Sequence, residues 1–79
     1  MRLDKYLKVS RLIKRRTLAN EVADAGRVMV NDKPAKASYD VKVGDKIEIS
    51  MGARTVAVEV LQVAETVRKD DAAAMYKEI

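Results

Sequence analysis

Apolar residues at the start of the chain recur at the spacing of a helix. At about 100° per residue they fall on one arc, while a second arc collects positive side chains. The residues on the apolar arc are Leu3, Tyr6, Leu7, Ser10 and Ile13. This pattern predicts a helix from about Arg2 to Ile13, with a short break at Lys14–Arg15, whose one face packs on a core.

A second apolar repeat predicts another helix over Thr17–Ala25. Leu18, Val22 and Ala25 share one face, which we expect to be the buried one. The polar residues between them are expected to point largely outward; they are Asn20, Glu21 and Asp24. Gly26 suits the left-handed residue that commonly ends a helix.

After Gly26 the apolar pattern changes to the alternation of strands. Arg27–Val30 is followed by the turn pair Asn31-Asp32, and Pro34 restricts the returning segment to a sheet edge. Two further alternating runs, 47–49 and 56–60, are separated by a turn at 51–54. Residues 70–79 are expected to form a short C-terminal helix.

These elements predict an α+β fold, with a helical pair followed by a small antiparallel sheet. The length of 79 residues favours one domain over residues 1–79. Its core is expected over about residues 1–50, with an additional strand and a C-terminal tail over 51–79.

Positive charge is concentrated in the first helix and the junction after it. Residues 2–16 contain seven of the 16 Lys and Arg residues and only one acid, Asp4, whereas residues 17–79 contain nine basic and eleven acidic residues. A polyphosphate partner rewards such clustering, because neutralising phosphates releases condensed counterions. The alternative is a solvated helix face that only keeps the protein soluble.

The composition argues against catalysis. The chain has no Cys and no His, so the Ser-His and Cys-His nucleophile arrangements and the usual transition-metal sites are excluded. We therefore expect no catalytic residues, no metal site and no cofactor. No apolar run approaches the roughly 20 residues of a membrane span, and the first residues lack the apolar region of a signal peptide. We expect a cytoplasmic protein that is not an enzyme.

Four segments in order resemble the S-four RNA-binding domain, which is named for a ribosomal protein of the small subunit. The segments are Arg2–Leu7 (RLDKYL), Arg16–Ala19 (RTLA), Gly26–Asn31 (GRVMVN) and Gly44–Ile47 (GDKI). The resemblance covers about residues 1–50. It implies a fold with the alpha-L motif, in which the helix pair and the following hairpin present one basic, L-shaped surface to RNA.

Within this family, two groups of small proteins match best. The RqcP (YabO) group of ribosome-associated quality control is similar across Lys8–Arg16 and at Ala74–Tyr76, and we favour it over the fifteen-kilodalton heat-shock protein group. This resemblance implies a factor that binds obstructed large ribosomal subunits with peptidyl-tRNA. The factor would hold the tRNA in the P site and support C-terminal alanine tailing.

The implied partners are large-subunit rRNA, peptidyl-tRNA, the large ribosomal subunit and an alanine-tailing factor of the RqcH or NEMF type. The protein is expected to be a monomer without a membrane partner. Three alternatives stay open: recycling of free large subunits carrying nascent chain-tRNA, a general structured-RNA-binding module, and an adaptor for membrane surfaces or acidic proteins.

The candidate RNA-binding residues follow from charge and from the family motif. Arg2 and Arg16 come first, because they match the motif and guanidinium forks suit phosphate. The other candidates in this stretch are Arg15, Arg11, Lys8, Lys14 and Lys5. Arg2 could instead pair with Asp4, and Lys5 and Lys14 could serve solubility alone.

Lys33 and Lys36 are weaker candidates beside the predicted hairpin turn, where ordinary exposed lysines are also common. Tyr39 either stacks on a base or packs. Because the chain has only three aromatic residues, all Tyr, recognition of RNA shape and backbone fits better than reading of a single-stranded sequence.

Overall fold

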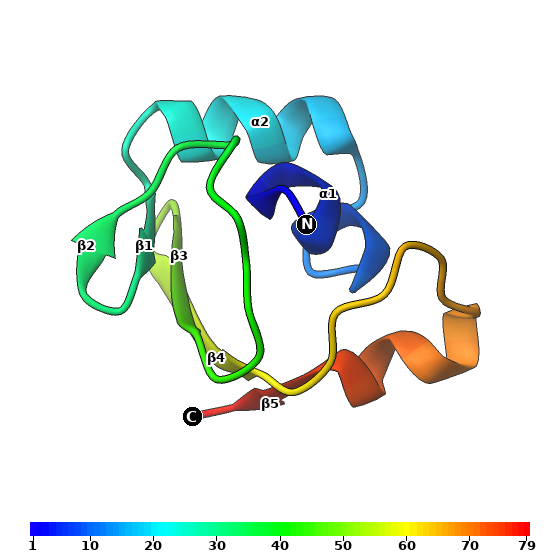
Figure 1. The fold of residues 1–79 in the computed structure, drawn as a ribbon. Coiled ribbons are helices and arrows are strands. Elements are labelled where there is room, and N and C mark those ends of the chain that lie inside the picture. Colours follow the sequence, from blue (N-terminus) through cyan, green and yellow to red (C-terminus); the bar gives the residue numbers. More distant parts are fainter.

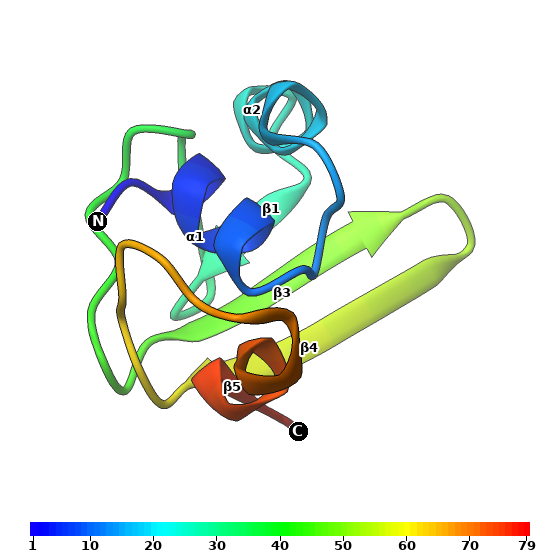
Figure 2. The same ribbon diagram turned by 90° about the vertical axis from the view of Figure 1, so that its right-hand side faces the viewer.

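Two helices cover one face of an antiparallel sheet in the computed structural model, which describes residues 1–79 (Figures 1 and 2). The helices are α1 (Leu3–Val9) and α2 (Arg16–Asp24). The strands are β1 (Val28–Val30), β2 (Lys33–Pro34), β3 (Lys46–Met51), β4 (Arg54–Val60) and β5 (Tyr76–Glu78), in the spatial order β2-β1-β3-β4-β5. A 3₁₀ helix, η1 (Lys69–Met75), precedes β5. The predicted α+β fold is confirmed.

The strand register places the apolar residues of the sheet in rows. Val30, Ile47 and Val58 lie side by side across β1, β3 and β4. Val28 and Ile49 form part of the next row, and all five side chains are buried. Since alternate residues of a strand share a face, one side of the sheet carries the core and receives Leu3, Tyr6 and Leu7 of α1.

The turns predicted at Gly26 and at Asn31-Asp32 are confirmed, and these residues adopt the left-handed conformation. Gly26, with φ +80°, ends the chain reversal after α2, and Asn31 and Asp32 have φ values of +52° and +68°. Two successive left-handed residues match the twist of a tight β-hairpin, and Asn and Asp tolerate that conformation. Pro34 lies on β2 at the sheet edge, as predicted.

The first helix is shorter than the predicted Arg2–Ile13. It ends at Val9, and Arg11 adopts the left-handed conformation with φ +64°. A left-handed residue cannot continue a right-handed helix. Ile13 nevertheless reaches the core from the turn, and its N–H donates to the Leu7 carbonyl at 3.0 Å.

The predicted buried face of the second helix is wrong by one residue position. Ala19 and Ala23 are buried, whereas Leu18 is 47% exposed and Ala25 is exposed. Small side chains let α2 lie close to the rest of the fold, so the bulkier Leu18 stays outside. The helix itself is found within one residue of its predicted limits.

The predicted short C-terminal helix over 70–79 is found only in its first part, because η1 ends at Met75 and Tyr76–Glu78 form β5. β5 pairs antiparallel with β4, placing Tyr76 opposite Val60 and Glu78 opposite Val58. The edge of β4 supplies backbone hydrogen-bond partners for residues 76–78, and these residues therefore extend the sheet. Met75 is fully buried, and the Tyr6 hydroxyl donates to its carbonyl at 2.7 Å. None of the helices has the length and apolar composition that a bilayer crossing requires.

Candidate RNA-binding surface

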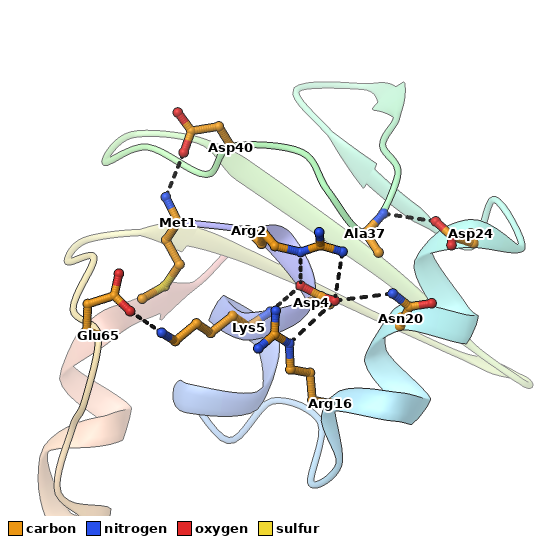
Figure 3. Close-up of polar contacts among 10 residues, drawn as sticks. All are labelled: Met1, Arg2, Asp4, Lys5, Arg16, Asn20, Asp24, Ala37, Asp40 and Glu65. Carbon is orange, nitrogen blue, oxygen red and sulfur yellow. Dashed lines mark hydrogen bonds and ion pairs between the residues drawn. The ribbon is translucent and has the colours of Figure 1, made fainter.

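Asp4 joins two of the candidate arginines in one unit (Figure 3). Its carboxylate accepts hydrogen bonds from Arg2 Nε at 3.1 Å and Arg2 Nη2 at 3.3 Å. On the other side, Arg16 Nε lies 3.5 Å from Asp4 Oδ2. The Lys5 backbone N–H and the Asn20 amide also donate to it, at 2.8 and 3.2 Å. We call Arg2, Asp4 and Arg16 the anchored arginine pair.

The electrostatics of Asp4 favour its charged form. Burial alone would raise the pKa of this carboxyl, since only 3% of the side chain is exposed. Hydrogen bonds from Arg2, Asn20 and the Lys5 N–H, together with the charge of Arg16, outweigh burial and lower the Asp4 pKa. The unit therefore stays ionised near neutral pH and carries one net positive charge.

Both arginines are held in place while remaining partly accessible. The Arg2 backbone pairs with Asp40 in an isolated antiparallel bridge, and Arg16 is the first residue of α2. Their side chains are 50% and 49% exposed. Pairing of Arg2 with Asp4 was the open alternative to RNA binding. The structure shows the pairing, and it leaves half of each guanidinium side chain facing solvent.

Lys5 forms an ion pair with a residue from a distant part of the chain. Its ammonium pairs with Glu65, which lies in the segment between β4 and η1 (Figure 3). Lys5 holds the pKa of the Glu65 carboxyl below its usual range, by hydrogen bond and by charge. The structure therefore shows Lys5 as one half of a surface ion pair.

Three other candidate cations, from α1 and the turn after it, surround a hollow on the surface. Lys8, Arg11 and Lys14 line a hollow of about 470 Å³ together with Lys69, and no other residue lines it. All four are exposed. We call these four residues the cationic pocket. Arg15 is also exposed and lies just before α2, outside this lining.

Lys33 and Lys36, the two weaker candidates, belong neither to the anchored arginine pair nor to the cationic pocket. Lys33 is on β2, which Figure 1 places across the molecule from the turn between α1 and α2. Lys36 is exposed and precedes Ala37, whose N–H donates to Asp24 at the end of α2 at 3.0 Å. The Tyr39 hydroxyl donates to Asp45 at 3.0 Å, and the ring is half-buried. Tyr39 therefore packs in this structure.

Sequence reasoning missed three members of these sites. From the sequence, Asp4 is only the single acid of a basic stretch and a possible partner of Arg2. In the structure it also pairs with Arg16, and it lies within the motif segment Arg2–Leu7. The helical pattern places Asn20 on the outward side of α2, yet its side-chain amide donates to Asp4. Lys69 had no local signal, because only the packing of η1 brings it to residues about 60 positions earlier in the chain.

Comparison with known proteins agrees with this fold and these motifs. Residues 1–47 match the S4 domain family. The RQC P-site tRNA stabilizing factor of Streptococcus pneumoniae (strain R6) is 57% identical over 77 residues, which span 98% of this chain and 88% of that protein. Its counterpart in Bacillus subtilis (strain 168) is 58% identical over 76 residues, spanning 96% of this chain and 88% of that protein.

A solved structure is also similar over the whole chain. The trimeric structure of Vibrio cholerae Heat Shock Protein 15 superposes with a TM-score of 0.93 at 30% identity, covering all of this chain and 81% of that one. The preference for the RqcP group over the heat-shock group is confirmed by the much higher identity of the first two relatives. The chain belongs to the S4 domain family and, within it, to the family of the RQC P-site tRNA stabilizing factors.

Proposed function

We propose that residues 1–79 act as one RNA-binding unit in ribosome-associated quality control in the bacterial cytoplasm. In this role the chain binds large ribosomal subunits that retain peptidyl-tRNA and holds that tRNA in the P site. Alanine tailing by a factor of the RqcH or NEMF type then continues. The names of the two relatives above 55% identity support the tRNA and ribosome part of this proposal.

The observation that carries the proposal is the anchored arginine pair. Two guanidiniums are oriented by one buried carboxylate and remain half exposed. Planar forks held in this way suit the oxygens of an RNA backbone, whereas freely rotating side chains would lose more entropy on binding. Such a surface positions RNA and needs no reacting group, so the proposed role is non-enzymatic.

The first test is a ribosome profile of cells that lack this protein. With the protein present, it co-sediments with large subunits that also carry the tailing factor. Deletion should abolish alanine tails on stalled nascent chains, which mass spectrometry of those chains measures. Normal tailing in the deletion strain would contradict the proposal.

Recycling of free large subunits is the second candidate, because the fold matches that of a heat-shock protein 15 with a TM-score of 0.93. Under recycling, deletion should leave the tails intact. Large subunits with attached nascent chain-tRNA should then accumulate without the tailing factor. The same gradients therefore separate the two functions.

The second test changes the surface itself. Arg16→Ala and Arg2→Ala should weaken binding to large subunits without unfolding the protein, and each should reduce the salt slope of binding by about one unit. Arg54→Ala is the matched control, because Arg54 is an exposed arginine at the start of β4, outside both groups. Unchanged binding in the Arg2/Arg16 double variant would reject this surface.

A further inference from the structure

The cationic pocket is built from parts of the chain that lie far apart in sequence. Lys8 is on α1, Arg11 and Lys14 are in the turn after it, and Lys69 begins η1. Figures 1 and 2 show η1 on the same side of the molecule as the end of α1, with the segment that follows β4 running between them. Residue 69 is outside the part of the chain that matches the S4 domain family. The pocket thus adds a residue from the C-terminal segment to the basic surface of the first helix.

The position of Lys69 is held by the fold. Ala72 and Met75 of η1 are buried, and the Met75 carbonyl accepts hydrogen bonds from the Tyr6 hydroxyl and from the Leu61 N–H at 2.7 and 2.8 Å. β5 then pairs with β4 directly after η1. These contacts hold the second half of η1 against the core, and Lys69 lies about one 3₁₀ turn before the buried Ala72.

No acidic residue lines the pocket, although Glu65, the partner of Lys5, shares a second hollow with Lys8 and Arg11. None of its four cations forms an ion pair, whereas Arg2 and Arg16 share Asp4 and Lys5 pairs with Glu65. Asp70 and Asp71 follow Lys69 without lining the pocket. Four positive groups around one hollow repel each other, and a polyanion that enters relieves this repulsion. The chemistry suits closely spaced phosphates.

We propose that Lys8, Arg11, Lys14 and Lys69 form a second phosphate-binding site, which holds the backbone of a structured RNA separately from the anchored arginine pair. This inference rests on the proposed RNA-binding function and deepens it. No aromatic residue lines the pocket, so the Arg11 guanidinium is its one flat group for stacking a base. The site therefore binds phosphates and is indifferent to sequence.

The test measures binding of a fluorescent tRNA transcript by anisotropy over a series of salt concentrations. Lys69→Glu should lower the affinity about tenfold, because it removes one charged contact and adds repulsion. Lys69→Ala should reduce the salt slope by about one unit. Lys77→Glu is the matched control: Lys77 is an exposed lysine on β5, so the charge change is the same outside the pocket. Its affinity should stay within about twofold of the unchanged protein.

Equal losses for Lys69→Glu and Lys77→Glu would overturn the site, since net charge alone would then explain both. Absence of measurable tRNA binding by the unchanged protein would overturn it as well. A parallel arm uses vesicles of phosphatidylglycerol and phosphatidylcholine. If Lys69→Glu weakens binding to the vesicles but leaves binding to tRNA unchanged, the pocket binds membranes and the RNA proposal is rejected.

The outcome is independent of the test of the proposed function. Alanine tailing could fail to depend on this protein while the tRNA transcript still requires Lys69, which would reject the quality-control role and keep the site. Conversely, tailing could depend on the protein while Lys69→Glu and Lys77→Glu bind alike, which would reject only the pocket.

Discussion

The anchored arginine pair and the cationic pocket both present positive charge to a ligand, but they differ in how the charged side chains are held. In the first, one buried carboxylate orients two arginines and offsets one of their charges. In the second, four exposed cations surround a hollow that no acidic residue lines. Orientation favours contacts with defined geometry, whereas uncompensated charge contributes mainly to attraction that salt screens. Basic residues that lie close together in sequence therefore have different physical roles in the fold.

The largest effect should come from removing the anchor. Asp4→Asn raises the net charge by one, which on charge alone would strengthen RNA binding. We expect the reverse, because Asn offers Arg2 and Arg16 one neutral acceptor oxygen in place of two charged ones and turns an NH2 donor toward them. The free energy of unfolding should fall by about 2 kcal/mol. Urea unfolding and binding to large subunits measure the two effects. Tighter binding by Asp4→Asn would show that the pair acts by charge and that its orientation is irrelevant.

The same carboxylate should make stability depend on pH. Its pKa is lower in the folded protein than the ordinary value of 3.8. The stabilising contribution is therefore complete above about pH 4 and is lost as the pH falls through the folded pKa. Thermal unfolding between pH 2 and pH 6 measures it. Asp4→Asn should lose less stability across this range than the unchanged protein, and parallel curves would contradict the assignment.

Exchanging the two kinds of cation sharpens the contrast between the regions. Arg16→Lys keeps the charge but removes the planar fork, so affinity for large subunits should fall about fivefold. Lys14→Arg keeps the charge of a pocket residue, and affinity should stay within about twofold. Anisotropy or co-sedimentation at one fixed salt concentration compares them. Equal effects of the two exchanges would mean that both regions respond to charge alone.

A smaller effect should follow from the backbone at Arg11. Its φ of +64° is unfavourable for a residue with a side chain, so Arg11→Gly should raise the free energy of unfolding by about 0.5 kcal/mol after the entropic cost of glycine. RNA affinity should fall, because the pocket loses one cation. Arg15→Gly is the control, since Arg15 has an ordinary φ of −121° and its replacement relieves no strain. Chemical denaturation distinguishes the two variants.

The smallest effect concerns the ion pair of Lys5. Glu65→Gln should release the Lys5 ammonium and raise RNA affinity by about twofold or less, because exposed ion pairs are weak. Stability should hardly change. Titration of tRNA against Glu65→Gln and, as a control, Glu78→Gln would detect the difference, and a loss of affinity would show that the pair orders the surface.

Local patterns predicted the fold well where each element depends on its own residues. The apolar alternation of Ile47–Ile49 and Val56–Val60 and the left-handed turn at Asn31-Asp32 needed no distant partner. Predictions failed where packing decided between alternatives. Hydrophobicity favoured Leu18 as buried, but close packing selected Ala19 and Ala23, and the edge of β4 recruited Tyr76–Glu78 as a strand.

The candidate site divides in the same way. Charge and motif identified Arg2 and Arg16, which the structure brings together, and also Lys8, Arg11 and Lys14. They did not distinguish oriented from unpaired cations, since that difference depends on Asp4 being buried among four donors. Lys69 could not be found from local sequence, because its place in the pocket depends on contacts between η1 and α1.

The hydrogen bond between Tyr6 and Met75 joins residues 69 positions apart in the chain. Consequently the first helix cannot complete its packing while the protein is still being synthesised as a short nascent chain. The cationic pocket forms only after the segment containing η1 has left the exit tunnel and docked. A ribosome that makes this protein therefore carries a growing chain whose basic helix lacks its finished binding surface until residues 69–75 have emerged and packed.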